Sequence, residues 1–189
     1  MTAMRNLMVC FMTLAMAATA LGQSAEAIQK ALTTEATSLA AWGTDKAFVD
    51  AVKGQNAKRV ALAEIKRIDG DWMAGKSDDV VRRVTSGPCA DRLRALVAAH
   101  PGYGEAFVMD DQGALVCANG HTSDYWQGDE SKWQRAFKGG KGDVFIDRPR
   151  YDDSAKAPLA QISVPVMDGG KAIGAITVGV NVNQIHPAH

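Results

Sequence analysis

Hydrophobic positions in the first part of the chain recur with the period of an α-helix. An Ala-rich segment from residue 24 to 52 places Ile28, Leu32 and Leu39 on one face, with an interruption near Gly43. A second helix is expected over residues 56–72, where apolar side chains recur at helical spacing: Ala61, Ile65, Ile68 and Trp72. We expect these two helices to support a sheet. After a polar connector made of residues 69–71 and 75–79, a third helix is expected to begin near Pro88.

From residue 105 the pattern changes to the alternation typical of β-strands. Strands are expected at residues 105–109, 114–118, 144–146, 159–167 and 171–182. Residues 150–153 read as a polar loop, and Pro165 indicates an edge position or a bulge in its strand. Asp129 and Glu130 are expected to cap a short helix that ends at residue 137. The order predicts an α+β domain with one five-stranded antiparallel sheet packed on long N-terminal helices.

The N-terminus has the pattern of a secretory signal peptide. Arg5 precedes an uncharged apolar run, and Ala18 and Ala20 form a small-x-small cleavage motif, so residues 1–20 are expected to be removed. Cleavage as late as residue 27 and an uncleaved anchor are the alternatives. The run of about 14 residues would span about 21 Å, which is shorter than the roughly 30 Å hydrocarbon core of a membrane. We therefore expect a periplasmic chain with one domain over residues 24–182 and a tail over residues 183–189.

The charge balance limits the classes of binding partner, and the cysteine content allows one disulfide. The 21 Lys and Arg residues balance 21 Asp and Glu residues, and no basic stripe is present, so nucleic acid and anionic lipid are not expected partners. Removal of the signal peptide would leave Cys89 and Cys117. In an oxidising compartment these two thiols either form a disulfide or are buried separately.

Two stretches carry a resemblance to a known family. GYGEAFVMDDQGALVCAN reads as a first sheet hairpin, and ISVPVMDGGKAIGAITVGV as a closing one. In this order, behind helices and a signal peptide, they resemble the Cache family of extracellular, PAS-like sensor domains. Two further stretches, DYWQGDESKWQRAF and VKGQNAKRVALAEIKRID, are similar to periplasmic single-Cache proteins. The resemblance implies a ligand pocket between the sheet and its connecting loops. Unlike most of the family, this sequence is expected to lack a second membrane helix and an output module.

The loop at residues 124–126 is the first candidate for a ligand contact. Tyr125 and Trp126 could stack on a ligand, and Asp124 could accept hydrogen bonds from an amine. The resemblance places this loop in the lining of the pocket. Alternatively, the three residues close a loop onto the sheet.

Further candidates lie in the last third of the chain. Arg148 or Arg150, next to Tyr151, could hold a carboxylate through two parallel hydrogen bonds, unless these arginines pair with acids on the surface. On the strands, Gln161 and Thr177 belong to polar, small-residue faces that leave room for a ligand, unless those faces are simply solvated.

Motifs for catalysis or for metal and cofactor binding are not found. Cys117 and His121 have a spacing seen in zinc sites but no second pair of ligands, and no nucleophile, zinc-protease or phosphate-loop motif occurs. We therefore expect a non-enzymatic sensor without a cofactor that binds an organic acid, an amino acid or an amine. Its expected partner is a membrane sensor kinase or transporter, and its N-terminal helix could form a homodimer. The alternatives are an interaction module with a vestigial pocket and, less favoured, an enzyme.

Overall fold

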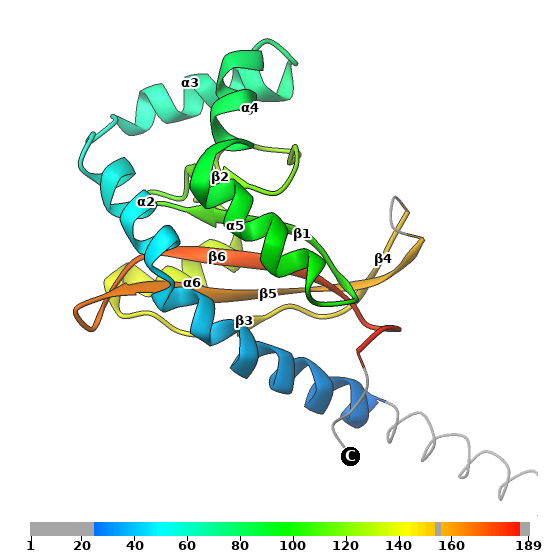
Figure 1. Cartoon of the computed structure of the whole chain (residues 1–189). Helices are drawn as coiled ribbons and strands as arrows, with labels where there is room; N and C mark the ends of the chain where they lie inside the picture. The colour runs from blue at the N-terminus through cyan, green and yellow to red at the C-terminus, as the bar shows by residue number, and fades with distance from the viewer. Residues whose placement is uncertain (1–24, 154–155, 186–189) are drawn as a thin grey trace, which may run out of the picture.

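One face of the sheet is covered by helices from the first half of the chain. The computed structural model describes residues 25–153 and 156–185, so the expected signal peptide lies outside the described residues. Residues 25–40 are helical and continue through the 3-10 turn η1 (Ala41–Thr44) into α2 (Lys46–Asn56), which Asp45 caps by accepting a hydrogen bond from the amide of Ala47. Figure 1 shows this part of the chain running across the sheet. Among the described residues, no helix is both long and apolar enough to cross a membrane.

Gly43 lies at the closest approach between η1 and the sheet. A Cβ atom at this position would be 2.1 Å from the carbonyl oxygen of Pro165. We expect Gly43→Ala to lower the free energy of unfolding by about 3 kcal/mol, because backbone would have to move on both sides. Gly54→Ala is the matched control: a Cβ there meets nothing within 4 Å, so this change in a helix should stabilise the protein by up to about 1 kcal/mol. Equal urea midpoints for the two variants would contradict this reading.

The predicted α+β fold with one antiparallel sheet is confirmed, with one more strand than expected. Its strands are β1 (Tyr103–Met109), β2 (Leu115–Ala118), β3 (Phe145–Ile146), β4 (Arg150–Asp152), β5 (Ala157–Asp168) and β6 (Lys171–Asn181). The order is β2-β1-β6-β5-β3, and β4 also pairs with β5. The prediction of a loop at residues 150–153 was therefore wrong, since Arg150 pairs with Leu159 of β5.

Pro165 lies where β5 has a strand on only one side. β3 ends opposite Ser163, whereas Pro165 pairs with Ala175 of β6. A register shift follows between Val166 and Met167. The proline therefore lies at a local edge of the sheet, beside a bulge. This position suits proline, because its nitrogen has no hydrogen to donate to a neighbouring strand.

Alternation along β5 and β6 separates two faces of the sheet. One face packs on the N-terminal helices and carries the main core, which includes Ile162, Val164, Ile176, Val178 and Val180. Register places the opposite-facing residues side by side, with Gln161 next to Gly179 and Ser163 next to Thr177. This second face is the one that matters for the candidate site.

The remaining helices differ from the sequence expectation in their bounds, in one additional helix and in capping. They are α3 (Leu62–Met73), α4 (Asp78–Val84), α5 (Gly87–Ala98) and α6 (Ser131–Phe137), which leads into the 3-10 turn η2 (Lys138–Gly140). α2 continues to Asn56, and Arg59, with a φ of 48°, lies in the turn before α3. α4 was not predicted, because Asp78 and Asp79 were assigned to a polar connector and the next helix was expected only near Pro88. Capping by Asp129 and Glu130 was also wrong, since Glu130 occupies the N-cap position without a side-chain hydrogen bond to the helix.

α3 does not support the sheet in the way that was expected. Ile65 and Trp72 are buried in a second core with α4, Tyr125 and the β2 end of the sheet, apart from the main core. In Figure 1, α3 lies beyond β2, away from the centre of the sheet. The support on the main face comes from residues 25–40, α2 and α5.

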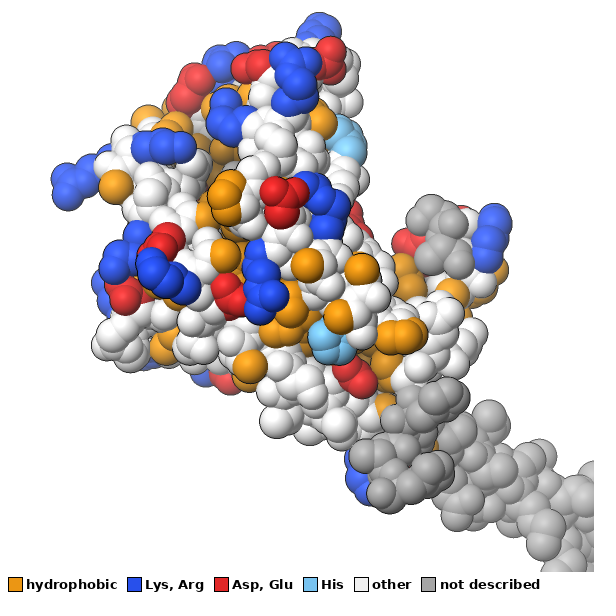
Figure 2. Space-filling model, viewed as in Figure 1, with side chains coloured by type: hydrophobic (Ala, Val, Ile, Leu, Met, Phe, Trp, Pro, Cys, Tyr) orange, Lys and Arg blue, Asp and Glu red, His pale blue; other side chains and the backbone are white. Residues whose placement is uncertain are grey.

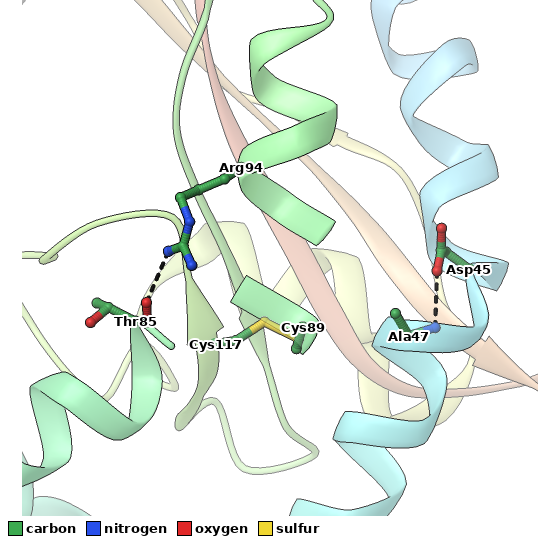
Figure 3. Close-up of a disulfide and its surroundings, with 6 residues drawn as sticks. All are labelled: Asp45, Ala47, Thr85, Cys89, Arg94 and Cys117. Atoms are coloured by element: carbon green, nitrogen blue, oxygen red, sulfur yellow. Dashed lines mark hydrogen bonds between the residues drawn. A yellow bond between two sulfur atoms is a disulfide. The ribbon is translucent and has the colours of Figure 1, made fainter. Parts of the chain in front are cut away.

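A disulfide joins α5 to β2. Cys89 and Cys117 are bonded, with 6.0 Å between their Cα atoms (Figure 3). Of the two alternatives that the sequence left open, the structure has the bridge. At the other end of the chain, Ile185 is buried in the main core, so the packed domain extends past residue 182 into the expected tail.

Candidate functional site

The second face of the sheet is covered over only half of its area. α6 crosses it with Lys132 over the ring of Phe107 on β1 and Arg135 over the ring of Phe145 on β3, at 5.5 and 4.5 Å from the ring centroids. The other half, beside Gly179, is open and forms the floor of a cavity of about 900 Å³. α6 therefore sets one boundary of the cavity.

The walls of the cavity come from three parts of the chain, and the start of β1 belongs to the floor. The walls are the loop after β2, the first turn of α6, and β4 with the turn before it. In Figure 1, β4 projects from the body of the molecule, and the surface in Figure 2 is indented between this projection and the rest. The chemically relevant lining residues are Glu105, His121, Glu130, Lys132, Asp147, Arg148, Arg150, Tyr151, Asp152, Gln161 and Asn181.

The wall formed by the loop after β2 is held by α3. The indole nitrogen of Trp72 donates a 2.8 Å hydrogen bond to the carbonyl of Thr122, and its ring stacks on His121 at 4.7 Å. Asp69 accepts hydrogen bonds from the amides of Tyr125 and Trp126, both at 2.9 Å. Two residues of one helix thus fix the loop that presents His121 to the cavity.

The charges in the cavity differ in their depth. The ammonium group of Lys132, whose side chain is 10% exposed, lies 2.9 Å from a carboxylate oxygen of Glu130. Glu105 lies on the floor and is exposed to the open cavity; partial loss of hydration raises the pKa of its carboxyl, and the nearby Lys132 opposes this rise. Arg150 is nearer to solvent, with a side chain that is 79% exposed and 3.5 Å from Asp147. The floor is therefore acidic around one paired lysine, and the arginines lie at the rim.

Four of the eight sequence-predicted ligand contacts line this cavity. Arg148, Arg150 and Tyr151 stand on the β4 side, and Gln161 lies on the floor next to Gly179. Contact of these four with a ligand stays a prediction, but their placement is compatible with it.

The other four residues lie elsewhere. Thr177 is fully buried beside Ser163, with 2.8 Å between the hydroxyl oxygens, on the half of the face that α6 covers. Trp126 donates its indole hydrogen to the carbonyl of Gln112 and lies beneath the ammonium group of Lys66. The carboxylate of Asp124 accepts a hydrogen bond from Ser123. This arrangement corresponds to the alternative in which the loop at residues 124–126 closes onto the body of the protein.

Tyr125 borders a different, smaller cavity. This cavity of about 280 Å³ lies between α2, α4 and β2. Arg83 and Gln55 line this cavity together with Tyr125, and burial raises the pKa of the Tyr125 hydroxyl. The ring is 2% exposed and packs in the second core.

Sequence reasoning missed Glu105 and Lys132. Glu105 could have been found, because it alternates with Ala106 in a strand whose next residues are all apolar. No local signal marks Lys132, which reaches the floor only because α6 packs across β1. Within the described ranges, no group of three or more His, Cys, Asp or Glu side chains is placed to hold a metal ion.

Comparison with known proteins gives a structural match only. No protein-family model matches the sequence, and no curated protein matches it. The sensor domain of the histidine kinase DctB from V. cholerae is similar in structure, with a TM-score of 0.51 and 11% identity over 92% of this chain and 57% of that one. At this level of identity the likeness shows a shared fold.

Two chemoreceptor ligand-binding domains are more distant. That of PctC from Pseudomonas aeruginosa PAO1, in complex with GABA, has a TM-score of 0.41 and 11% identity over 69% of this chain and 62% of that one. That of Tlp3 from Campylobacter jejuni has a TM-score of 0.36 and 13% identity over 82% and 60%. This chain therefore spans roughly three fifths of the length of the structures that it matches.

Proposed function

We propose that this chain, which has the fold of the Cache-type sensor domains, binds a small polar metabolite in the cavity on the half of the sheet that α6 leaves open. The observation that carries the proposal is the cavity itself. Its volume of about 900 Å³ lies within the usual range of small-molecule sites, roughly 300–1,000 Å³. The floor is part of one sheet, and charged side chains of both signs surround it.

Gly179 gives the cavity its depth. It pairs with Gln161 in the middle of the floor, where a side chain would occupy the space open to a ligand. A Cβ atom at Gly179 would come no closer than 3.6 Å to the backbone of Glu105, which is an ordinary contact. Packing around the backbone of residue 179 therefore does not require glycine. The missing side chain instead leaves room for a ligand.

The ligand contacts that we propose are those that line the cavity. Arg148, Arg150 and Tyr151 would approach from the rim, and Gln161 would hydrogen-bond from the floor. Asp124, Tyr125, Trp126 and Thr177 are not part of this proposal, because they lie outside the lining. The role is binding rather than catalysis.

The proposed setting is the periplasm. The signal-peptide pattern at residues 1–20 and the Cys89–Cys117 bridge both suit an oxidising compartment outside the cytoplasm. The proposed partner is a membrane sensor kinase or transporter that reads the liganded state, and the helix at residues 25–40 is the proposed surface for a homodimer. Light scattering of the purified protein tests the dimer.

Thermal unfolding of the purified protein with panels of amino acids, organic acids and amines tests the binding proposal. We expect at least one compound, at about 100 times its Kd, to stabilise the protein by about 2.7 kcal/mol, which corresponds to a rise in Tm of roughly 5–10 °C. Gly179→Val should remove this response, because a β-branched side chain suits a strand but fills the floor. Gly54→Ala, outside the cavity, should keep it.

An interaction module with a vestigial pocket is the alternative. In that case no compound would raise the Tm of the wild-type protein, or Gly179→Val would respond like the wild type. Either result would contradict the assignment of the cavity as a ligand site.

A further inference from the structure

The smaller cavity, where α2, α4 and β2 approach one another, has the features of a second binding site (Figure 1). It shares no lining residue with the larger cavity. Its walls include the apolar side chains of Val84 and Leu115, which are 2% and 1% exposed, and of Ala51 and Val116. The volume of about 280 Å³ is slightly below the usual range for drug-sized ligands, so only a small molecule fits.

Gly54 lies in the middle of the wall that α2 contributes. The neighbouring lining residues on this side are Asp50, Ala51, Gln55 and Lys58, at helical spacing around it. A Cβ atom at residue 54 would meet nothing within 4 Å, so packing does not require glycine there. Because glycine inside a helix is less stable than alanine, its presence has a cost to the fold. The missing side chain leaves the mouth of the cavity open.

Two cations at this cavity form no ion pair among the described residues. Arg83 has no acidic partner there, although Asp79 precedes it by one turn of α4. The ammonium group of Lys58 donates a 3.0 Å hydrogen bond to the amide oxygen of Gln55 and has no acidic partner either. Burial raises the pKa of the Tyr125 hydroxyl and the charge of Arg83 opposes that rise, so the guanidinium group lies close to this hydroxyl. Both cations are exposed and stand at the mouth of the cavity.

The acids near the smaller cavity have partners of their own. Asp50 forms an ion pair with Lys46. Asp110, whose charge also acts on the tyrosine hydroxyl, does not line the cavity and accepts hydrogen bonds from the amides of Gln112 and Ala114, both at 2.9 Å. The mouth of the cavity therefore carries an excess of positive charge next to apolar walls.

We infer that the smaller cavity binds a short aliphatic monocarboxylate, with its carboxylate at Arg83 and its hydrocarbon chain against Val84 and Leu115. A guanidinium group matches a carboxylate through two parallel hydrogen bonds, and Lys58 and the Tyr125 hydroxyl are further donors. The apolar walls favour a hydrocarbon chain, which inorganic phosphate lacks. This inference does not rest on the proposed function, because the two cavities share no lining residue.

Amide correlation NMR of the isotopically labelled protein tests the inference and reports where a compound binds. Butyrate, butylamine and inorganic phosphate are the probes. We expect butyrate to shift the amide signals of Gly54, Val84 and Leu115 to saturation, and the other two compounds to leave them unchanged. Acetate, shorter by two methylene groups, should bind roughly tenfold more weakly than butyrate. The butyrate shifts should persist in Gly179→Val, in which the larger cavity is filled.

Three variants separate the proposed contacts from general effects of charge and stability. Arg83→Gln should weaken butyrate binding about five- to tenfold, between the effects typical of an exposed ion pair and of a hydrogen bond to a charged group. Arg82→Gln, the same change one residue earlier on α4 and outside the cavity lining, should leave the affinity unchanged. Gly54→Leu should abolish binding without lowering the Tm, because leucine forms helix better than glycine and its side chain would occupy the mouth.

The results that would contradict the inference are distinct from those that bear on the larger cavity. Phosphate or butylamine binding as tightly as butyrate would overturn the monocarboxylate assignment, and so would equal affinities in Arg83→Gln and Arg82→Gln. No saturable shift around Gly54 with butyrate would refute the site itself. Butyrate shifts that appear only around Gln161 and vanish in Gly179→Val would support the proposed function and overturn this inference.

Discussion

Replacement of Trp72 by alanine is expected to lower the free energy of unfolding by about 3–5 kcal/mol. The indole is 1% exposed, donates a hydrogen bond to the Thr122 carbonyl, and contacts the rings of His121 and Tyr125. Its loss would leave a void between α3 and the loop after β2 that neither element can close without moving. Urea denaturation followed by far-ultraviolet circular dichroism measures the change.

A milder substitution separates stability from the shape of the cavity. Trp72→Phe keeps most of the buried ring but leaves the Thr122 carbonyl without its donor, at a cost of about 1–3 kcal/mol. Because this loop presents His121 to the cavity, we expect weaker ligand binding in the folded variant. Trp126→Phe loses a similar hydrogen bond, to Gln112, outside the cavity and should bind ligand like the wild type. Equal ligand affinity in the two variants would contradict a positioning role for Trp72.

Reduction of the Cys89–Cys117 bridge is the second large effect. The two residues are separated by 28 positions, and closing a loop of this length restricts the unfolded chain by about 3–4 kcal/mol in the chain-entropy view. For a domain of this size, the Tm should fall by roughly 6–16 °C when the protein is unfolded with a strong reductant present. Scanning calorimetry with and without reductant measures the shift.

A variant without the bridge provides the control for the reduction experiment. Cys89→Ala combined with Cys117→Ala should unfold at about the temperature of the reduced wild type and should not respond to reductant. Because Cys117 lies in β2 and Cys89 in α5, away from the cavity lining, we expect ligand binding in the folded variant to persist. A wild-type Tm that is insensitive to reductant would refute a stabilising role for the bridge.

The local sequence pattern was sufficient to predict helices and strands that have a clear hydrophobic periodicity. Strand β6 follows from the alternation of residues 171–182, and α5 follows from an apolar stripe that begins at Pro88. Elements without such a pattern were missed. β4 consists of Arg150, Tyr151 and Asp152, which contain no buried side chain, and it is a strand only because β5 pairs with it.

The candidate site was predictable in the same uneven way. The position of Gln161 in the cavity lining could be expected, because alternation alone decides which face of a strand a residue occupies, while its contact with a ligand stays a prediction. Tyr125 and Trp126 were expected in the pocket lining but lie outside that of the larger cavity, because a loop has no periodicity that fixes the direction of an aromatic side chain. Asp69 and Trp72, more than 50 residues earlier in the chain, hold that loop and turn its aromatic rings away from the cavity.

By itself, the sequence determined the α+β class, the antiparallel sheet and the division of β5 and β6 into an apolar and a polar face. These features depend on backbone geometry, which repeats every few residues and is therefore visible in the order of side chains. Only the tertiary structure decided which half of the polar face stays open. That choice depends on where α6 packs, and packing between distant segments brings Lys132 beside Glu105 without any trace in the local pattern.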